Sequence, residues 1–123
     1  MIGYVTLGTN DFEKAKTFYD KALAALGAGR TMTMDRIQGY GVKGSPAMLA
    51  VCKPYDGRPA TSGNGTMVSF FAPSRQIVDK VHADALAAGA ADEGAPGLRG
   101  ETFYAAYFRD PDGNKLCVFN TGG

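Results

Sequence analysis

The fold is decided by residues 4–27, YVTLGTNDFEKAKTFYDKALAALG. Residues 4–8 alternate apolar side chains with polar or aromatic ones, which is typical of a strand with one buried face. A helix is predicted next, because Asn10 can cap it and Glu13 can complete a capping box. Apolar side chains then recur at helical spacing until Gly27, a typical helix-ending residue. The stretch therefore predicts a strand followed directly by an amphipathic helix.

The same order of elements occurs twice along the chain. After the first helix, three short strands are predicted near residues 30–35, 37–43 and 47–53. Residues 66–71 alternate again, and a second helix is predicted to open at Pro73-Ser74 and to stop at Gly89. Further strands are predicted near residues 91–93, 102–109 and 115–120. Two βαβββ units, offset by about 63 residues, indicate an internal duplication.

We therefore expect a single α+β domain over residues 1–123, built from two βαβββ modules in tandem. The first module covers about residues 1–53 and the second about residues 66–123. Residues 54–65 are rich in Pro, Gly and small polar side chains and have no apolar period, so we expect a linker there.

Alternation along the predicted strands assigns each side chain to one face of a sheet. The side chains expected to pack under the helices are Val5, Leu7, Val68, Phe70, Leu116 and Val118. Those expected to point the other way are Tyr4, Thr6, Met67, Ser69, Cys117 and Phe119. The second set mixes small, polar and aromatic groups, which is more typical of a cavity lining than of a sealed core. We expect a curved mixed sheet around a cup-shaped cavity.

Composition excludes several classes of function. The chain has 13 Lys+Arg against 12 Asp+Glu without basic clusters, so we expect neither nucleic acid nor a membrane surface as a partner. A single histidine argues against a His-rich metal centre. The two cysteines are too few for a disulfide framework, and no apolar run is long enough to span a bilayer. These features favour a cytoplasmic protein.

Five motifs occur in a characteristic order: LGTND at 7–11, FYDKALAALG at 18–27, PATSGNGT at 59–66, EGAPGLR at 93–99 and RDPDGN at 109–114. In these motifs the chain resembles the vicinal oxygen chelate superfamily, which includes glyoxalase I, bleomycin-resistance proteins and extradiol dioxygenases. The resemblance spans nearly the whole chain. It implies paired βαβββ modules around a cup, in which metal-dependent members hold a divalent ion.

In those members the metal ligands are His on the first strand of each module and a carboxylate on the last strand. The matching positions here are Tyr4, Met67 and Cys117, with Leu49 or Val51 at the fourth. None is His, Asp or Glu, so the donors do not suit Mg²⁺, Mn²⁺, Fe²⁺ or Zn²⁺. We therefore expect a lost metal site, no cofactor and no assigned catalytic residue. A soft ion such as Cu(I) or Hg(II), gripped by Cys117 and Met67, is the alternative, although such residues more often fill apolar space.

Three hypotheses about function follow. In the first, the cup binds a small, partly apolar organic molecule, as the resemblance to bleomycin-resistance proteins implies. In the second, a lyase- or dioxygenase-type enzyme works without the usual metal site, with Tyr4 in acid–base chemistry. In the third, the cavity is filled and the chain is a dimeric interaction protein. The resemblance also implies a homodimer. The predicted ligand-binding residues are Tyr4, Thr6, Leu49, Val51, Met67, Ser69, Tyr104, Cys117 and Phe119.

Two other features invite a functional interpretation that we do not favour. His82 lies on or beside the buried stripe of the second helix, so we expect a hydrogen-bonded structural histidine. Asp110-Pro111-Asp112-Gly113 has two acids, but it is a strong turn signal and lacks the other ligands that calcium requires.

Overall fold

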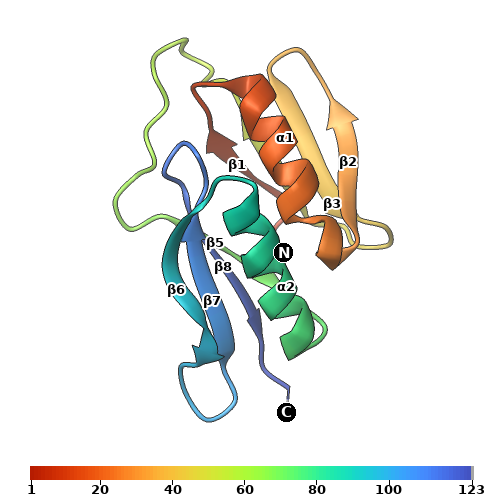
Figure 1. The fold of residues 1–123 in the computed structure, drawn as a ribbon. Helices are drawn as coiled ribbons and strands as arrows, with labels where there is room; N and C mark the ends of the chain where they lie inside the picture. Colours follow the sequence, from red (N-terminus) through yellow and green to blue (C-terminus); the bar gives the residue numbers. More distant parts are fainter. Residues whose placement is uncertain (123) are drawn as a thin grey trace.

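The structure is a computed structural model that describes residues 1–122. The first module contains β1 (Tyr4–Gly8), α1 (Phe12–Ala22), a short 3-10 helix η1 (Ala24–Leu26), β2 (Ala28–Thr33), β3 (Ile37–Val42) and β4 (Met48–Cys52). The second contains β5 (Met67–Phe71), α2 (Arg75–Ala87), β6 (Ala91–Leu98), β7 (Tyr104–Arg109) and β8 (Lys115–Asn120). The predicted α+β class and the tandem βαβββ order are confirmed (Figure 1). The last residue of the predicted second module, Gly123, lies outside the described residues.

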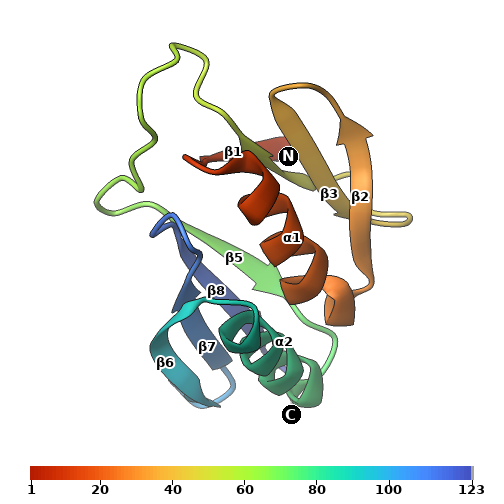
Figure 2. The same ribbon diagram turned by 45° about the horizontal axis from the view of Figure 1, so that its top comes forward.

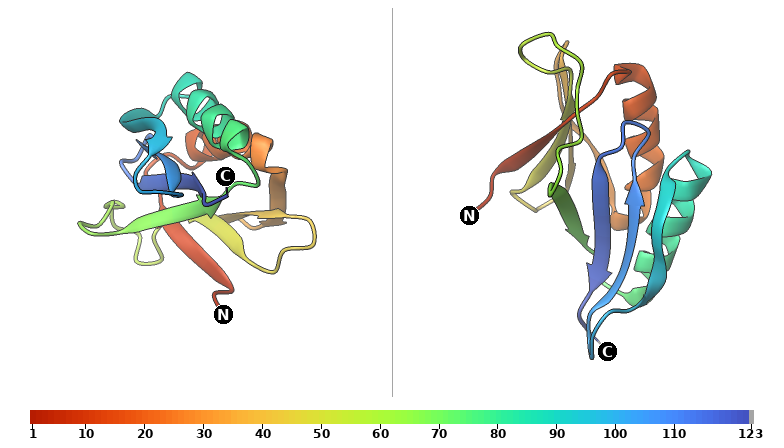
Figure 3. Two further views of the ribbon diagram at one scale, coloured as in Figure 1. Left: turned by 90° about the horizontal axis from the view of Figure 1, so that it is seen from below. Right: turned by 90° about the vertical axis from the view of Figure 1, so that its left-hand side faces the viewer.

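Each module folds into a four-stranded mixed sheet with the same topology. The strand orders are β1-β4-β3-β2 and β5-β8-β7-β6. In each sheet the first strand runs parallel to the last, and the other pairs are antiparallel. Both helices lie on one side of the strands, as Figure 3 shows, so each sheet has a helix-covered side and an open side. Figure 2 shows residues 53–66 arching as a long loop from β4 to β5.

The first helix begins one residue later than the capping box predicts. Asp11 is the N-cap, and its carboxylate accepts a hydrogen bond from the backbone N–H of Lys14 at 3.1 Å. The predicted cap, Asn10, is wrong because its side chain is engaged with the linker. Its Oδ1 accepts from the backbone N–H of Ala60 at 2.7 Å, and its Nδ2 donates to the Ala60 carbonyl at 3.2 Å. Asn10 thus ties the linker to the start of α1.

The second helix begins where the sequence predicts, but β6 is longer than predicted. Ser74 caps α2 by accepting from the backbone N–H of Ile77 at 3.2 Å. Strand β6 runs beyond residue 93 to Leu98, with register shifts against β7 on both sides of Gly94. A strand rich in glycine and proline has no alternating apolar pattern, so its full length could not be predicted from the sequence.

Both modules share one hydrophobic core beneath the helices. Leu7, Leu116 and Val118 are buried in it, with Val68 and Phe70 packed against it, and Val5 is half-buried. The predicted helix-facing set is therefore confirmed apart from Val5, which is not part of the core cluster. Between the modules, the ring centroids of Phe18 on α1 and Phe108 on β7 lie 6.5 Å apart.

A buried polar cluster, which we call the module clasp, joins α1 to the β7–β8 turn. It consists of Tyr19, Asp110 and Asn114. The Tyr19 hydroxyl donates to Asp110 Oδ2 at 2.5 Å, and Asn114 Nδ2 donates to the same oxygen and to the Gly8 carbonyl, both at 2.9 Å. Burial, with Asp110 beside it, raises the pKa of Tyr19 well above its ordinary value. The clasp gives buried polar groups their partners and links the two modules.

The remaining sequence features are placed as follows. The turn predicted at residues 110–113 is confirmed, because the Gly113 N–H donates to the Asp110 carbonyl at 2.9 Å and Gly113 has a φ of 89°. His82 is buried, and its Nε2 lies 3.0 Å from Asp92 Oδ1, as expected for a hydrogen-bonded structural histidine. Within residues 1–122 no helix is long and apolar enough to cross a membrane.

Candidate functional site

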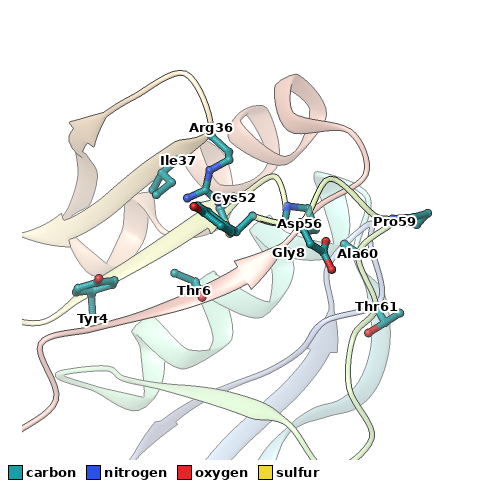
Figure 4. Close-up of a pocket in the computed structure, with 12 residues that line it drawn as sticks. Tyr4, Thr6, Gly8, Arg36, Ile37, Cys52, Asp56, Pro59, Ala60 and Thr61 are labelled. Carbon is teal, nitrogen blue, oxygen red and sulfur yellow. The ribbon is translucent and has the colours of Figure 1, made fainter.

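The open side of the first sheet carries a hollow of about 530 Å³ (Figure 4). Its lining comes from β1, β3, β4, the residue before β3 and the linker: Tyr4, Thr6, Gly8, Arg36, Ile37, Cys52, Pro54, Tyr55, Asp56, Pro59, Ala60 and Thr61. The volume falls within the range of small-molecule pockets in proteins.

The hollow forms because its floor is built from small residues. The parallel pairing of β1 and β4 sets Thr6 opposite Ala50 and Gly8 opposite Cys52, all on the side away from the helices. A Cβ atom at Gly8 would lie only 2.9 Å from the Cβ of Ala60, so a glycine is needed there for the linker to close over the end of β1.

Polar groups stand at the rim of this hollow. Arg36 Nη1 donates to the Lys53 carbonyl at 2.8 Å, and its guanidinium lies 5.3 Å from the centre of the Tyr55 ring. Asp56 Oδ1 accepts from the backbone N–H of Arg58 at 2.9 Å. A small-residue floor with a cation, a carboxylate and a phenol at the rim can orient an organic molecule that has a polar end.

The predicted ligand-binding residues divide between the two sheets. Tyr4 and Thr6 line the hollow. The pairing of Ser69 with Cys117 places those two on the open side of the second sheet, and Met67 and Phe119 lie on the same side by alternation. Those four are not among the residues that line the hollow.

Three of the predicted residues point to the helix side instead, so their expected place in the cup is wrong. Leu49 and Val51 are buried in the core. The Tyr104 hydroxyl donates to Asp79 Oδ1 on α2 at 2.6 Å. Because side chains alternate along a strand, an error of one residue moves the whole set to the other face.

On β4 and β7 the residues that face the open side are Ala50 and Tyr107, which were not among the predicted ligand-binding residues. Ala50 pairs with Thr6, and Tyr107 pairs with Cys117. Alternation could have identified both residues. Side chains an odd number of residues apart on a strand point to opposite faces, and Ala50 is one residue from Leu49 while Tyr107 is three from Tyr104.

The donors at the positions implied for a metal do not fit a divalent ion. They are a phenol, a thioether and a thiol at Tyr4, Met67 and Cys117, with Ala50 and Cys52 on the open side of β4. Over residues 1–122, no three His, Cys, Asp or Glu side chains gather where they could hold a metal. Burial raises the pKa of the Cys117 thiol, which disfavours the thiolate needed for a nucleophile or a ligand.

The sequence model of the Glyoxalase/Bleomycin resistance protein/Dioxygenase superfamily matches residues 1–118. The chain belongs to this superfamily. A glyoxalase/bleomycin resistance protein from Albidiferax ferrireducens T118 has a similar structure, with 38% identity, 98% coverage of both chains and a TM-score of 0.89. Among curated proteins, none matches this superfamily member.

Two more distant structures share the fold alone. A glyoxalase/bleomycin resistance protein/dioxygenase family enzyme from Burkholderia phytofirmans PsJN is 22% identical, with 97% of each chain covered and a TM-score of 0.77. Lactoylglutathione lyase from Agrobacterium tumefaciens is 21% identical, with 98% of this chain and 92% of that chain covered and a TM-score of 0.69.

Proposed function

We propose that this superfamily member binds a small, partly apolar organic molecule, and that it does so without a metal ion. The observation that carries the proposal is the hollow of about 530 Å³ on the open side of the first sheet, with its small-residue floor and polar rim. Loss of the metal site belongs to the same proposal. It is supported by the donor types at Tyr4, Met67 and Cys117, which a divalent ion does not favour.

We also propose that the protein is a cytoplasmic homodimer. Large apolar side chains of the first module stand exposed outside the hollow: Ile2 is 60%, Met34 53% and Val42 41% exposed. A second copy that covers part of this surface would bury apolar area that now faces water. Cys52 and Cys117 are free thiols, which suits a reducing compartment.

A thermal-shift screen tests the binding function. The protein is screened with a library of aromatic and partly apolar compounds, with and without EDTA. A compound at 100 times its Kd stabilises the native state by about 2.7 kcal/mol, so the unfolding midpoint should rise by several degrees and be indifferent to EDTA. If no compound shifts the midpoint, or if shifts occur only with added metal, the proposal is wrong.

A pair of variants locates the binding. Thr6→Trp fills the hollow from its floor and should abolish the shift. Thr17→Trp introduces the same side chain at an exposed position of α1, in the helix layer, and should leave the shift unchanged. If the compounds raise the unfolding midpoint of Thr6→Trp as much as that of Thr17→Trp, they bind outside the hollow.

A further inference from the structure

A second feature of the open surface involves Arg99, which among residues 1–122 is held in place by backbone carbonyls and not by a carboxylate. Its backbone N–H donates to the Phe103 carbonyl at 2.7 Å, and its Nη2 donates to the Ala95 carbonyl at 2.6 Å. A Cβ at Gly94 would lie 3.2 Å from Nη2, and one at Gly97 would lie 3.1 Å from Nη1. The two glycines therefore leave the space in which the guanidinium rests on β6.

Lys115 on β8 places a second cation beside the same aromatic ring. The Arg99 guanidinium lies 5.5 Å and the Lys115 ammonium 5.7 Å from the centre of the Tyr107 ring. Neither cation forms an ion pair with a carboxylate among residues 1–122, whereas neighbouring Arg109 is paired with Glu93 at 2.7 Å.

The register of the second sheet defines what lies next to these cations. Tyr107 pairs with Cys117, and Cys117 pairs with Ser69, so these three form one row across the open side from β7 to β5. Two strand spacings make this row about 10 Å long. Cys117 is buried and small, and Ser69 is exposed with a hydroxyl that can donate or accept.

Apolar side chains border the row along β8 and β5. Phe119 stacks on Phe103 with ring centroids 5.3 Å apart and meets Phe71 edge-on at 5.8 Å. Phe71 is 62% exposed, and Met67, on the other side of Ser69 along β5, is 43% exposed. On the open side of the second sheet the Arg99 guanidinium thus lies near the ring of Tyr107 on β7, and Met67 and Phe71 flank Ser69 on β5, where Met67 pairs with Lys115 of β8.

We propose that this surface binds an aryl carboxylate about 10 Å long, with its carboxylate between Arg99 and Lys115 and its ring over Ser69 beside Phe71 and Met67. A carboxylate forms charge-assisted hydrogen bonds with a guanidinium, and the fixed position of Arg99 lowers the ordering cost of binding. The second-sheet residues predicted from sequence to bind a ligand, other than Tyr104, form or border this surface. The site stands independently of the hollow in the first sheet.

The probe pair is trans-cinnamate and its neutral analogue cinnamamide, which differ at the carboxylate but match in length and ring. Each is titrated into the full chain while amide chemical shifts are followed by NMR. Cinnamate should shift the amides of Ser69, Tyr107 and Cys117 saturably and bind at least ten-fold more tightly than cinnamamide. Arg99→Gln and Lys115→Gln should each weaken cinnamate at least five-fold, and sodium chloride should weaken it in the wild type.

Lys80→Gln on α2 is the matched control, because it removes one positive charge from the helix layer; it should leave cinnamate binding unchanged. Thermal unfolding of each variant confirms that it is folded. The proposal is overturned if cinnamate and cinnamamide bind equally, if both site variants bind like the wild type, or if inorganic phosphate alone binds as tightly as cinnamate. Shifts confined to Thr6, Cys52 and Tyr55 would also overturn it, while supporting a ligand in the hollow instead.

Discussion

Removing the Tyr19 hydroxyl tests whether the module clasp holds the two modules together. In Tyr19→Phe the ring stays in the core, 5.0 Å from Phe18 and 5.9 Å from Tyr40 between centroids, so packing is preserved. The variant loses the 2.5 Å hydrogen bond from the Tyr19 hydroxyl to Asp110 Oδ2. That oxygen still accepts a hydrogen bond from Asn114 Nδ2 at 2.9 Å. Hydrogen bonds to charged groups contribute about 1.5–3 kcal/mol, so we expect a loss of about 2 kcal/mol.

Urea unfolding at pH 7 and thermal unfolding measure this effect. For a chain of this size, 2 kcal/mol corresponds to a fall of roughly 6–10 °C in the unfolding midpoint. Tyr55→Phe is the control, because Tyr55 is 90% exposed, and it should change the free energy of unfolding by less than about 0.5 kcal/mol. If Tyr19→Phe loses no more stability than Tyr55→Phe, the clasp does not contribute as argued.

The same variant has an alkaline signature. Tyrosine in the unfolded chain ionises near pH 10, whereas the pKa of buried Tyr19 is raised well above that value, first by burial and then by Asp110. The contribution of Tyr19 is therefore fully present below pH 10 and is lost as the pH rises above it, at up to about 1.4 kcal/mol per pH unit. Above pH 10 the stability of Tyr19→Phe should fall less steeply than that of the wild type. Parallel curves would contradict the buried, protonated hydroxyl.

Two further predictions concern local contacts. The pKa of Asp92 is lowered by the backbone N–H of Gly94 and then by His82, so the carboxylate stabilises the fold above its ordinary pKa of 3.8 and loses that effect as the pH falls. Unfolding midpoints of Asp92→Asn and wild type should therefore differ at pH 7 and converge in acid; a constant difference would argue against this linkage. Asn10→Ala should accelerate hydrogen exchange at the Ala60 amide by about ten-fold or more, because that N–H loses its 2.7 Å acceptor. Unchanged exchange would mean that Asn10 does not hold the linker.

The sequence predicted the two modules because local patterns carry that information. Alternation in β1 and β5, the Ser74 cap and the turn at residues 110–113 are all decided within a few residues. The cap of α1 was misplaced because Asn10 and Asp11 are both competent caps, and a contact with Ala60, 50 residues away, decides between them.

The candidate site was predicted only in part, because it depends on strand register and on long-range contacts. The β1 and β5 residues of the predicted site were placed correctly on the open side, whereas Leu49, Val51 and Tyr104 were assigned to the wrong face. The linker residues at the rim of the hollow carry no periodic signal, and their position follows from anchors such as Asn10. The Arg99 guanidinium rests in the space left by Gly94 and Gly97. Both glycines belong to an irregular strand, so no periodic pattern in the sequence predicts this position.

We propose that this superfamily member works without the divalent metal site that the resemblance to metal-dependent members implies. Equilibrium dialysis of the protein against Zn²⁺, Mn²⁺, Ni²⁺ and Fe²⁺, followed by elemental analysis, tests it most directly. Because a phenol, a thioether and a protonated thiol suit none of these ions, we predict far less than one metal ion per chain. One divalent ion per chain, lost on substitution of Tyr4, Met67 or Cys117, would contradict the account.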